Sequence, residues 1–174
     1  MPGVRRTDSR IRPAMRNARD KPPPSARATA IRMLARRDLS RAELEQRLRA
    51  RGIAEASIAE TLDEFERLGW LSDARYARGL VEQRAGRYGK RAIARDLHDR
   101  KVAPAAASEA LAALQSRDEL ADATALWSRR FGEVPRDDRE KGRQIRFLMS
   151  RGYSAAIAFK VLRAAGASVD GDPE

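Results

Sequence analysis

The sequence predicts an all-α protein: three tandem three-helix repeat modules in an elongated, curved, solenoid-like arrangement, preceded by a disordered basic N-terminal tail. Two observations predict this class. Apolar residues follow helical spacing and do not show the period of two that marks strands. A helix, a tight break and a second helix recur at residues 47–62, 96–111 and 147–162, with offsets of 49 and 51 residues. A repeat period near 50 residues is typical of stacked helical modules.

The three copies share a register when Arg51, Arg100 and Arg151 are aligned. One leucine stands three residues before each arginine and another stands eleven residues after it, which gives the columns Leu48, Leu97 and Leu148, and Leu62, Leu111 and Leu162. Helices rich in Ala, Leu and Arg look alike by composition alone, but two filled columns favour a true repeat. The match weakens at Gln144, where the first two copies have an apolar residue.

A flexible tail is expected over residues 1–24, which are rich in arginine and end in a proline run. The first module is expected over residues 25–71, with a first helix at about 25–37. Ser40 followed by Glu43 is a capping-box pattern, which predicts the start of the second helix. The third helix carries an apolar face at spacings of four and three, formed by Ile58, Leu62 and Phe65.

The second module is expected over residues 72–115 and the third over residues 116–165, followed by a frayed C-terminus at 166–174. Pro104 suits the first turn of a helix because its missing N–H needs no partner there. Ser116 with Glu119 forms another capping box, which predicts the start of the third module's first helix.

The break after the second helix of each module favours a residue in the left-handed conformation. Gly52 and Gly152 adopt this conformation at little cost. Lys101 stands at the same place in the middle module, so the turn there is expected to differ.

Catalytic chemistry has little support in the sequence. The 174 residues include no cysteine and one histidine, His98, which excludes disulfides, cysteine nucleophiles and multi-histidine metal sites. His98 is read as a solvated helix residue. There is no phosphate-binding loop of the P-loop type and no GxGxxG turn, and the acidic clusters do not resemble those of metal-dependent nucleases. We therefore expect a binding protein with no catalytic residue, no metal site and no cofactor.

The formal charge of +11 points to a polyanionic partner: nucleic acid, a nucleoprotein or a membrane surface. Residues 1–27 hold 8 Lys/Arg and 2 Asp/Glu, a net of +6, which leaves +5 for the rest of the chain. No apolar run is long enough to span a bilayer, and the N-terminus lacks the apolar core of a secretory signal. Arginine-rich starts also occur in organelle transit peptides, but we favour a disordered tail on a cytoplasmic protein.

Basic side chains gather around two of the predicted breaks. The planar fork of arginine donates two parallel hydrogen bonds to phosphates or carboxylates, so a collective cluster predicts a polyanion-binding surface. Any single one of these residues is more often simply solvated. The candidate contact residues are Arg84, Arg87, Lys90, Arg91 and Arg95 around the first break, and Arg129, Arg130, Arg136, Arg139, Lys141, Arg143 and Arg146 around the second.

A helix-turn-helix that reads DNA bases is one interpretation of residues 40–65, because of the glycine break. The same unit occurs three times, however, and the would-be recognition helix AEASIAETLDEFERL is acidic. Both features disfavour a protein that reads the major groove.

Longer stretches resemble the RecX family of bacterial regulatory proteins. The resemblance rests on RMLARRDLSRAELEQRLRARGI (32–53), LDEFERLGWLSDARYARGLVEQRAGRYGKRAIARDL (62–97) and KGRQIRFLMSRGYSAAIAFKVL (141–162), and it covers about residues 25–165. It implies three tandem three-helix repeats in a crescent that lodges along the groove of the RecA–DNA filament. It also implies a modulator, usually an inhibitor, of RecA ATP hydrolysis, strand exchange and co-protease activity, and hence of recombination, DNA repair and the SOS response.

The partners that the resemblance implies are the RecA recombinase filament and DNA, with single-stranded DNA as the main form and double-stranded DNA as a further one. We expect the protein to be a monomer. The turn at 101–104 departs from the family pattern because it lacks the usual glycine and acidic residue. The alternative is a helical repeat protein that binds nucleic acid independently of RecA, and a nuclease or other enzyme is disfavoured.

Overall fold

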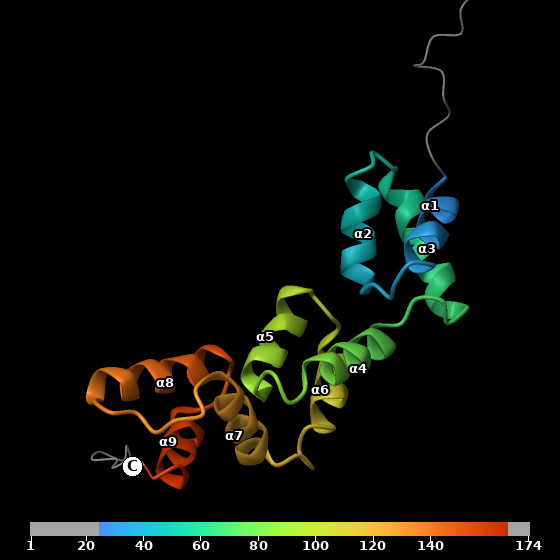
Figure 1. The fold of residues 1–174 in the computed structure, drawn as a ribbon. Coiled ribbons are helices and arrows are strands. Elements are labelled where there is room, and N and C mark those ends of the chain that lie inside the picture. Colours follow the sequence, from blue (N-terminus) through green and yellow to red (C-terminus); the bar gives the residue numbers. More distant parts are fainter. Residues whose placement is uncertain (1–24, 167–174) are drawn as a thin grey trace, which may run out of the picture.

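The computed structural model describes residues 25–166, and in this part of the chain it contains nine α-helices and no strand (Figure 1). The predicted all-α class is confirmed. The predicted tail at 1–24 and residues 167–174 lie outside the described residues. The helices are α1 (Ala26–Leu34), α2 (Arg41–Arg49), α3 (Glu55–Arg67), α4 (Asp73–Arg84), α5 (Lys90–Asp99), α6 (Pro104–Ala112), α7 (Glu119–Arg130), α8 (Asp138–Ser150) and α9 (Ala155–Ala164).

The helices form three modules that follow one another in a curved row (Figure 1). Helices that pack extensively against each other belong to the same set: α1 to α3 in module 1, α4 to α6 in module 2, and α7 to α9 in module 3. Each set encloses a hydrophobic cluster of its own. The predicted repeat architecture is thus confirmed, and the modules meet through loops and helix ends rather than through a shared core.

The leucine column before the aligned arginines forms the centre of each core, since Leu48, Leu97 and Leu148 are fully buried. In the second column, Leu62 and Leu162 are buried and Leu111 is half-buried. These side chains hold the second helix of each module against the third. Burying one leucine stabilises the fold by about 1.5–3 kcal/mol. Each pair therefore supplies a large part of the hydrophobic free energy that stabilises a small module.

The turn after the second helix has the same form in all three modules. Gly52, Lys101 and Gly152 have φ angles of 72°, 52° and 91°. In module 2 the N–H of Val102 donates to the carbonyl of Leu97 at 3.1 Å, as the N–H after Gly152 does to Leu148 at 3.2 Å. The prediction of a different turn at Lys101 is therefore wrong, because the backbone hydrogen bonds of this helix end outweigh the steric cost of a left-handed lysine.

Two helix starts test the capping boxes. Ser40 caps α2 as predicted, since its Oγ accepts from the N–H of Glu43 at 3.1 Å. Ser116 does not cap α7, because its hydroxyl donates to a carbonyl of the preceding turn. Asp118 is the cap and accepts from two N–H groups at 3.0 Å each. A carboxylate satisfies two orphan donors and suits the positive helix end, so Asp118 displaces the predicted start by two residues.

Gln144, where the repeat weakens, is buried in the core of module 3. Its Oε1 accepts from Trp127 Nε1 at 2.7 Å, and its Nε2 donates to the carbonyl of Glu133 at 3.3 Å. A tryptophan that is buried needs a partner for its N–H. Gln144 therefore supplies the hydrogen-bond acceptor that Trp127 needs. The position stays buried, as it is in the other two modules.

Candidate functional site

Neighbouring modules are joined end to end through their second helices, α2, α5 and α8. Ser40 at the start of α2 donates from Oγ to the carbonyl of Arg100, which ends α5, at 3.0 Å. Gly89 at the start of α5 donates its N–H to the carbonyl of Arg151, which ends α8, at 2.9 Å. Each contact brings a positive helix start to a negative helix end. The three helices lie along one side of the row, the inner side of its bend (Figure 1).

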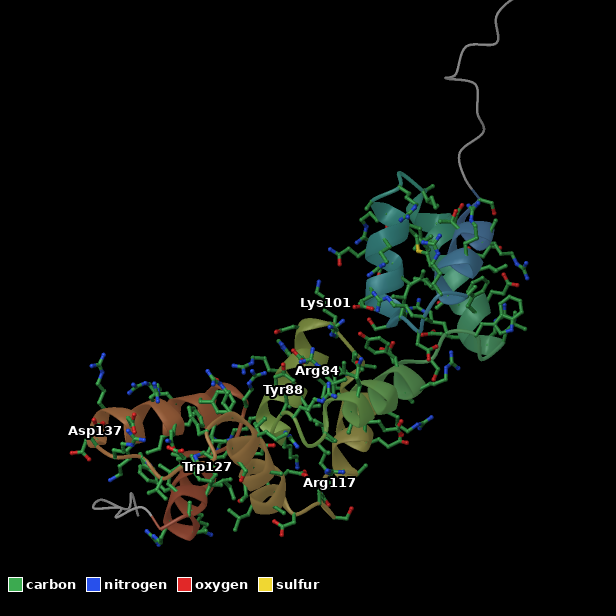
Figure 2. All side chains as sticks on the ribbon, in the orientation of Figure 1. Arg84, Tyr88, Lys101, Arg117, Trp127 and Asp137 are labelled. Carbon is green, nitrogen blue, oxygen red and sulfur yellow. The ribbon has the colours of Figure 1, made fainter. Side chains whose placement is uncertain are left out.

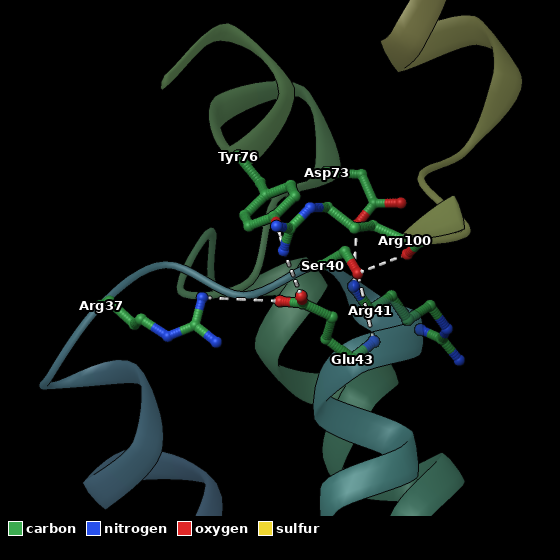
Figure 3. A network of polar contacts seen from close by, with 7 residues as sticks. All are labelled: Arg37, Ser40, Arg41, Glu43, Asp73, Tyr76 and Arg100. Carbon is green, nitrogen blue, oxygen red and sulfur yellow. Dashed lines mark hydrogen bonds and ion pairs between the residues drawn. The ribbon is translucent and has the colours of Figure 1, made fainter. Parts of the chain in front are cut away.

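The junction between modules 1 and 2 is a polar network (Figure 3). Asp73, the first residue of α4, accepts from the N–H of Arg41 in module 1 and from the N–H of Ala103 in module 2, both at 2.8 Å. These two N–H groups belong to the starts of α2 and α6 and have no partner within their helices. One carboxylate therefore fixes the direction in which two helices leave the junction.

Arg100 completes this network across the same junction. Its guanidinium donates to Glu43 Oε1 at 2.8 Å and to the hydroxyl of Tyr76 at 2.9 Å (Figure 3). Arg37 approaches the other Glu43 oxygen, Oε2, at 3.8 Å, which is too long for a hydrogen bond. Burial, reinforced by the Glu43 carboxylate, raises the pKa of Tyr76. Glu43 is thus used between modules and not as the second half of a capping box.

The junction between modules 2 and 3 depends on close backbone contact. A Cβ placed on Gly89 would lie 2.6 Å from the carbonyl oxygen of Gly152, and a Cβ on Gly152 would lie 2.5 Å from the Ala92 side chain. Arg151 lies 5.2 Å from the ring centre of Tyr88 and donates to its hydroxyl at 3.0 Å. The two glycines therefore allow the modules to approach at a distance that no larger residue permits.

The first predicted cluster of basic residues lies at this second junction. Arg84 pairs with Asp96 at 3.0 Å and lies 4.7 Å from the ring centre of Tyr88, and Figure 2 shows Arg84 and Tyr88 together in module 2. Arg91 and Arg95 are exposed one turn apart on α5. The remaining two, Arg87 and Lys90, are also exposed. Four of the five candidates are thus open to a partner, and Arg84 is already engaged within the protein.

The second predicted cluster divides into parts. Arg129 donates to the carbonyl of Gly86 at 3.4 Å and lines a shallow depression together with Arg87, so it joins the first cluster. Arg130 and Arg143 lie 5.4 and 5.8 Å from the ring centre of Phe131. The other candidates belong to α8 or to the loop before it: Arg136, Arg139 and Arg146 are exposed and Lys141 is half-buried.

Two acidic residues reduce the positive charge around Phe131. Glu133 lies 3.4 Å from Arg136, and Glu140 lies 3.8 Å from Arg143. These are exposed pairs that stabilise little and can exchange partners. In this part of the described chain, Arg139, Lys141 and Arg146 of α8 form no ion pair.

Sequence reasoning missed the groups that hold the modules together, above all Asp73 and Arg100. It also missed Arg151, although all three copies place an arginine at this position of the repeat. That alignment was a usable signal, because an arginine that recurs at a helix end in every copy suggests a structural role. The partners of Asp73 lie 32 and 30 residues away, and no local pattern identifies them.

Residues 25–166 give little support to metal binding, histidine chemistry or membrane insertion. No group of three or more His, Cys, Asp or Glu side chains there could hold a metal ion. The His98 side chain is 89% exposed and lies 3.6 Å from Asp99, as a solvated helix residue would. Among the described helices, none has the length and apolar character that crossing a membrane requires.

Comparison with known proteins agrees with the three modules. The family models for the first, second and third three-helix domains of RecX match residues 26–65, 72–111 and 117–162. The regulatory protein RecX of Leptothrix cholodnii is 41% identical over 155 residues, which is 89% of this chain and 98% of that protein. The regulatory protein RecX of Ralstonia nicotianae is 37% identical over 152 residues, 87% of this chain and 95% of that protein.

Solved structures show the same fold. The crystal structure of RecX from Lactobacillus salivarius matches with a TM-score of 0.67 at 19% identity, over 80% of this chain and 94% of that one. Another crystal structure of a regulatory protein RecX matches with a TM-score of 0.68 at 16% identity, over 80% and 70%. With three domain models matched in order and relatives that are similar over nearly their whole length, the chain belongs to the RecX family of regulatory proteins.

Proposed function

We propose that this protein binds the RecA–DNA filament and inhibits RecA ATP hydrolysis, strand exchange and co-protease activity, and thereby limits recombination and the SOS response. Membership of the RecX family supports RecA as the partner. The observation that carries the proposal is the end-to-end series of α2, α5 and α8 along the inner side of the bend. A curved bar of this kind fits around a filament better than around a small ligand.

Basic side chains on two of these helices supply the attraction. Arg91 and Arg95 project from α5, and Arg139, Arg143 and Arg146 are exposed on α8. Since α5 and α8 are held end to end, we propose that these charges act together as one extended basic surface. A surface of this kind suits the phosphates of filament DNA or acidic faces of RecA.

The proposed mechanism is bridging of successive RecA subunits. Modules that bind neighbouring subunits act as linked weak ligands, so their combined affinity exceeds that of any one module. A bar with fixed junctions binds best to one spacing of the subunits and shifts the filament toward that spacing. ATP turnover that requires the spacing to change would then slow down.

The test is RecA ATPase activity on single-stranded DNA with increasing amounts of the purified protein. Inhibition is expected at or below equimolar ratios, and unchanged hydrolysis and assembly at several-fold molar excess would contradict the proposal. Reversing charge at Arg91 and Arg95 together should weaken filament binding and flatten its salt dependence. The paired variant Arg67→Glu with Lys160→Glu is a control that makes the same charge change at exposed residues of α3 and α9.

The alternative is a nucleic-acid-binding repeat protein that acts independently of RecA, and the exposed arginines of α5 and α8 are the observation in its favour. Capture of RecA in the absence of DNA supports the first proposal. Capture that requires DNA and is equal for any DNA-coating protein supports the second. Sedimentation of the protein alone tests the expectation that it is a monomer.

A further inference from the structure

We infer that a groove in module 1 binds an acidic peptide segment of the protein partner, an inference that rests on the proposed function and names the chemistry of one contact. The groove lies between α1 and α2 and encloses about 540 Å³. It is called the module 1 groove below, and it is lined by Thr29, Arg32, Met33, Arg36, Arg37, Leu39, Arg47 and Arg51. None of these residues belongs to the basic clusters described above.

The lining of the module 1 groove is strongly positive and has no acidic member. Its five arginines are all exposed, whereas Leu39 is buried and Met33 is half-buried at its base. Arg37 is the one that comes near a carboxylate, 3.8 Å from Glu43, among the residues that the structure describes. Neither Arg36 nor Arg47 has a carboxylate partner in that part of the chain. Five guanidinium groups around a partly apolar base favour an anionic ligand with carbon-rich stems.

The repeat itself indicates which anion fits. When Arg51 is aligned with Arg100, Arg47 of module 1 corresponds to Asp96 of module 2. In module 2, Asp96 of α5 pairs at 3.0 Å with Arg84, the last residue of the first helix, α4. Module 1 replaces this carboxylate with a fifth arginine. The arginines from the end of its first helix therefore lack the internal acid that module 2 provides.

Module 3 has Phe147 at this position of the repeat, but it supplies carboxylates from elsewhere. Its groove between α7 and α8 contains Arg130, Arg136 and Arg143, and it also contains Glu133 and Glu140. In two of three modules, arginines between the first and second helices thus have carboxylates of the chain itself beside them. A carboxylate from outside is the group that would complete module 1 in the same way, so we favour an acidic peptide over the phosphates of DNA.

The decisive variant is Arg47→Asp in the full-length protein, because it gives module 1 the acid that module 2 has. Its aspartate is expected to pair with Arg32 or Arg36 and to close the groove without disturbing the core, since position 47 is exposed. The matched control is Arg67→Asp, which makes the same charge change at an exposed arginine in the last turn of α3, as Arg47 is in the last turn of α2. Circular dichroism on heating checks that both variants fold as the unmodified protein does.

The probe is a fluorescein-labelled peptide of ten glutamates, with a ten-glutamine peptide and an oligothymidylate as comparison ligands, measured by fluorescence anisotropy at an ionic strength of about 0.15 M. We expect Arg47→Asp to weaken glutamate-peptide binding by about tenfold or more, since two charge-assisted hydrogen bonds are lost. Arg67→Asp should weaken it by less than about fivefold, the effect of a screened surface charge. The glutamine peptide should not bind.

Three outcomes would overturn the inference: no binding of the glutamate peptide, equal losses in the two variants, or an effect of Arg47→Asp on oligothymidylate alone, which would make the groove a nucleic-acid contact. The RecA ATPase assay with the unmodified protein tests the proposed function independently of the groove. Absence of inhibition there would contradict the proposed function and leave the peptide result intact. Inhibition together with absent peptide binding would contradict only the groove.

Discussion

Gly89 and Gly152 touch backbone to backbone where modules 2 and 3 meet, so that a Cβ on Gly89 would lie 2.6 Å from the carbonyl oxygen of Gly152. Gly89 has an ordinary φ of −73°, so it is glycine because of this contact and not because of its conformation. The atoms opposite are backbone and cannot rotate away. The junction therefore sets the angle between two modules through the absence of one side chain.

Gly89→Ala is expected to destabilise the protein by about 1–3 kcal/mol, the usual cost of forcing an extra methyl group into a packed contact. Urea unfolding measures it. Gly79→Ala is the control, because Gly79 lies within α4 and its added Cβ would meet no atom within 4 Å; there alanine should stabilise by about 0.5–1 kcal/mol. Equal stabilities for the two variants would mean that the junction opens easily.

Asp73→Ala is expected to cost about 2–3 kcal/mol, because the N–H groups of Arg41 and Ala103 both lose a charged acceptor. The measurement is again the free energy of unfolding in urea. Asp99→Ala serves as the control, since the Asp99 side chain is 66% exposed and should change stability by less than about 0.5 kcal/mol. A loss at Asp73 no greater than that of the control would show that water replaces the carboxylate.

Much of the fold was predictable because it depends on local periodicity. The spacing of Leu48, Leu97 and Leu148 identified the repeat, and the same residues are fully buried. Errors arose where two local signals competed: Asp118 was a better cap than Ser116, and a left-handed Lys101 was less costly than a new turn. In each case the deciding residue was visible in the sequence, but the relative free energies of the competing arrangements were not.

The candidate site was less predictable for a different reason. Arginine clusters are visible in composition, but their pairing depends on which elements the fold brings together. Arg129 contacts Gly86 across 43 residues, and Arg84 is taken by Asp96. The module 1 groove is not a cluster in sequence, since its arginines come from α1, α2, the loop between them and the turn after α2.

Lys101→Gly is expected to stabilise the protein by about 1 kcal/mol, because the left-handed conformation at φ 52° strains a residue that has a Cβ. Thermal and urea unfolding report the gain. Gly52→Ala makes the opposite change at the matching turn of module 1, where φ is 72°, and should cost a similar amount. If both variants shift stability in the same direction, the turns are not equivalent.

Gln144→Leu tests why the repeat weakens in module 3. Leucine fits the column, yet we expect a loss of about 1–3 kcal/mol because Trp127 Nε1 would be buried without an acceptor. The double variant with Trp127→Phe separates this effect from packing. Its cost should be less than the sum of the two single costs, whereas strict additivity would show that the hydrogen bond contributes nothing.

Tyr153 predicts a dependence of stability on high pH. Its hydroxyl is buried and has no hydrogen-bond partner in the described structure, and burial, aided by the nearby Asp122 carboxylate, raises its pKa to about 12. Below the ordinary tyrosine pKa of about 10, the folded and unfolded chains both keep the proton, so this contribution is intact. Between pH 10 and 12 the unfolded chain releases the proton first, and stability falls by about 2–3 kcal/mol as pH rises.

Tyr153→Phe removes that titration together with the unpaired hydroxyl. We expect a gain of up to about 1 kcal/mol at pH 7 and a smaller loss of stability between pH 10 and 12, measured by urea unfolding at each pH. Tyr88→Phe is the comparison, because the Tyr88 hydroxyl accepts from Arg151 and its removal should destabilise at pH 7. A loss of stability at pH 7 in the Tyr153 variant would mean that an ordered water bonds to the hydroxyl. Removing a buried hydroxyl costs stability when that group has a hydrogen-bond partner.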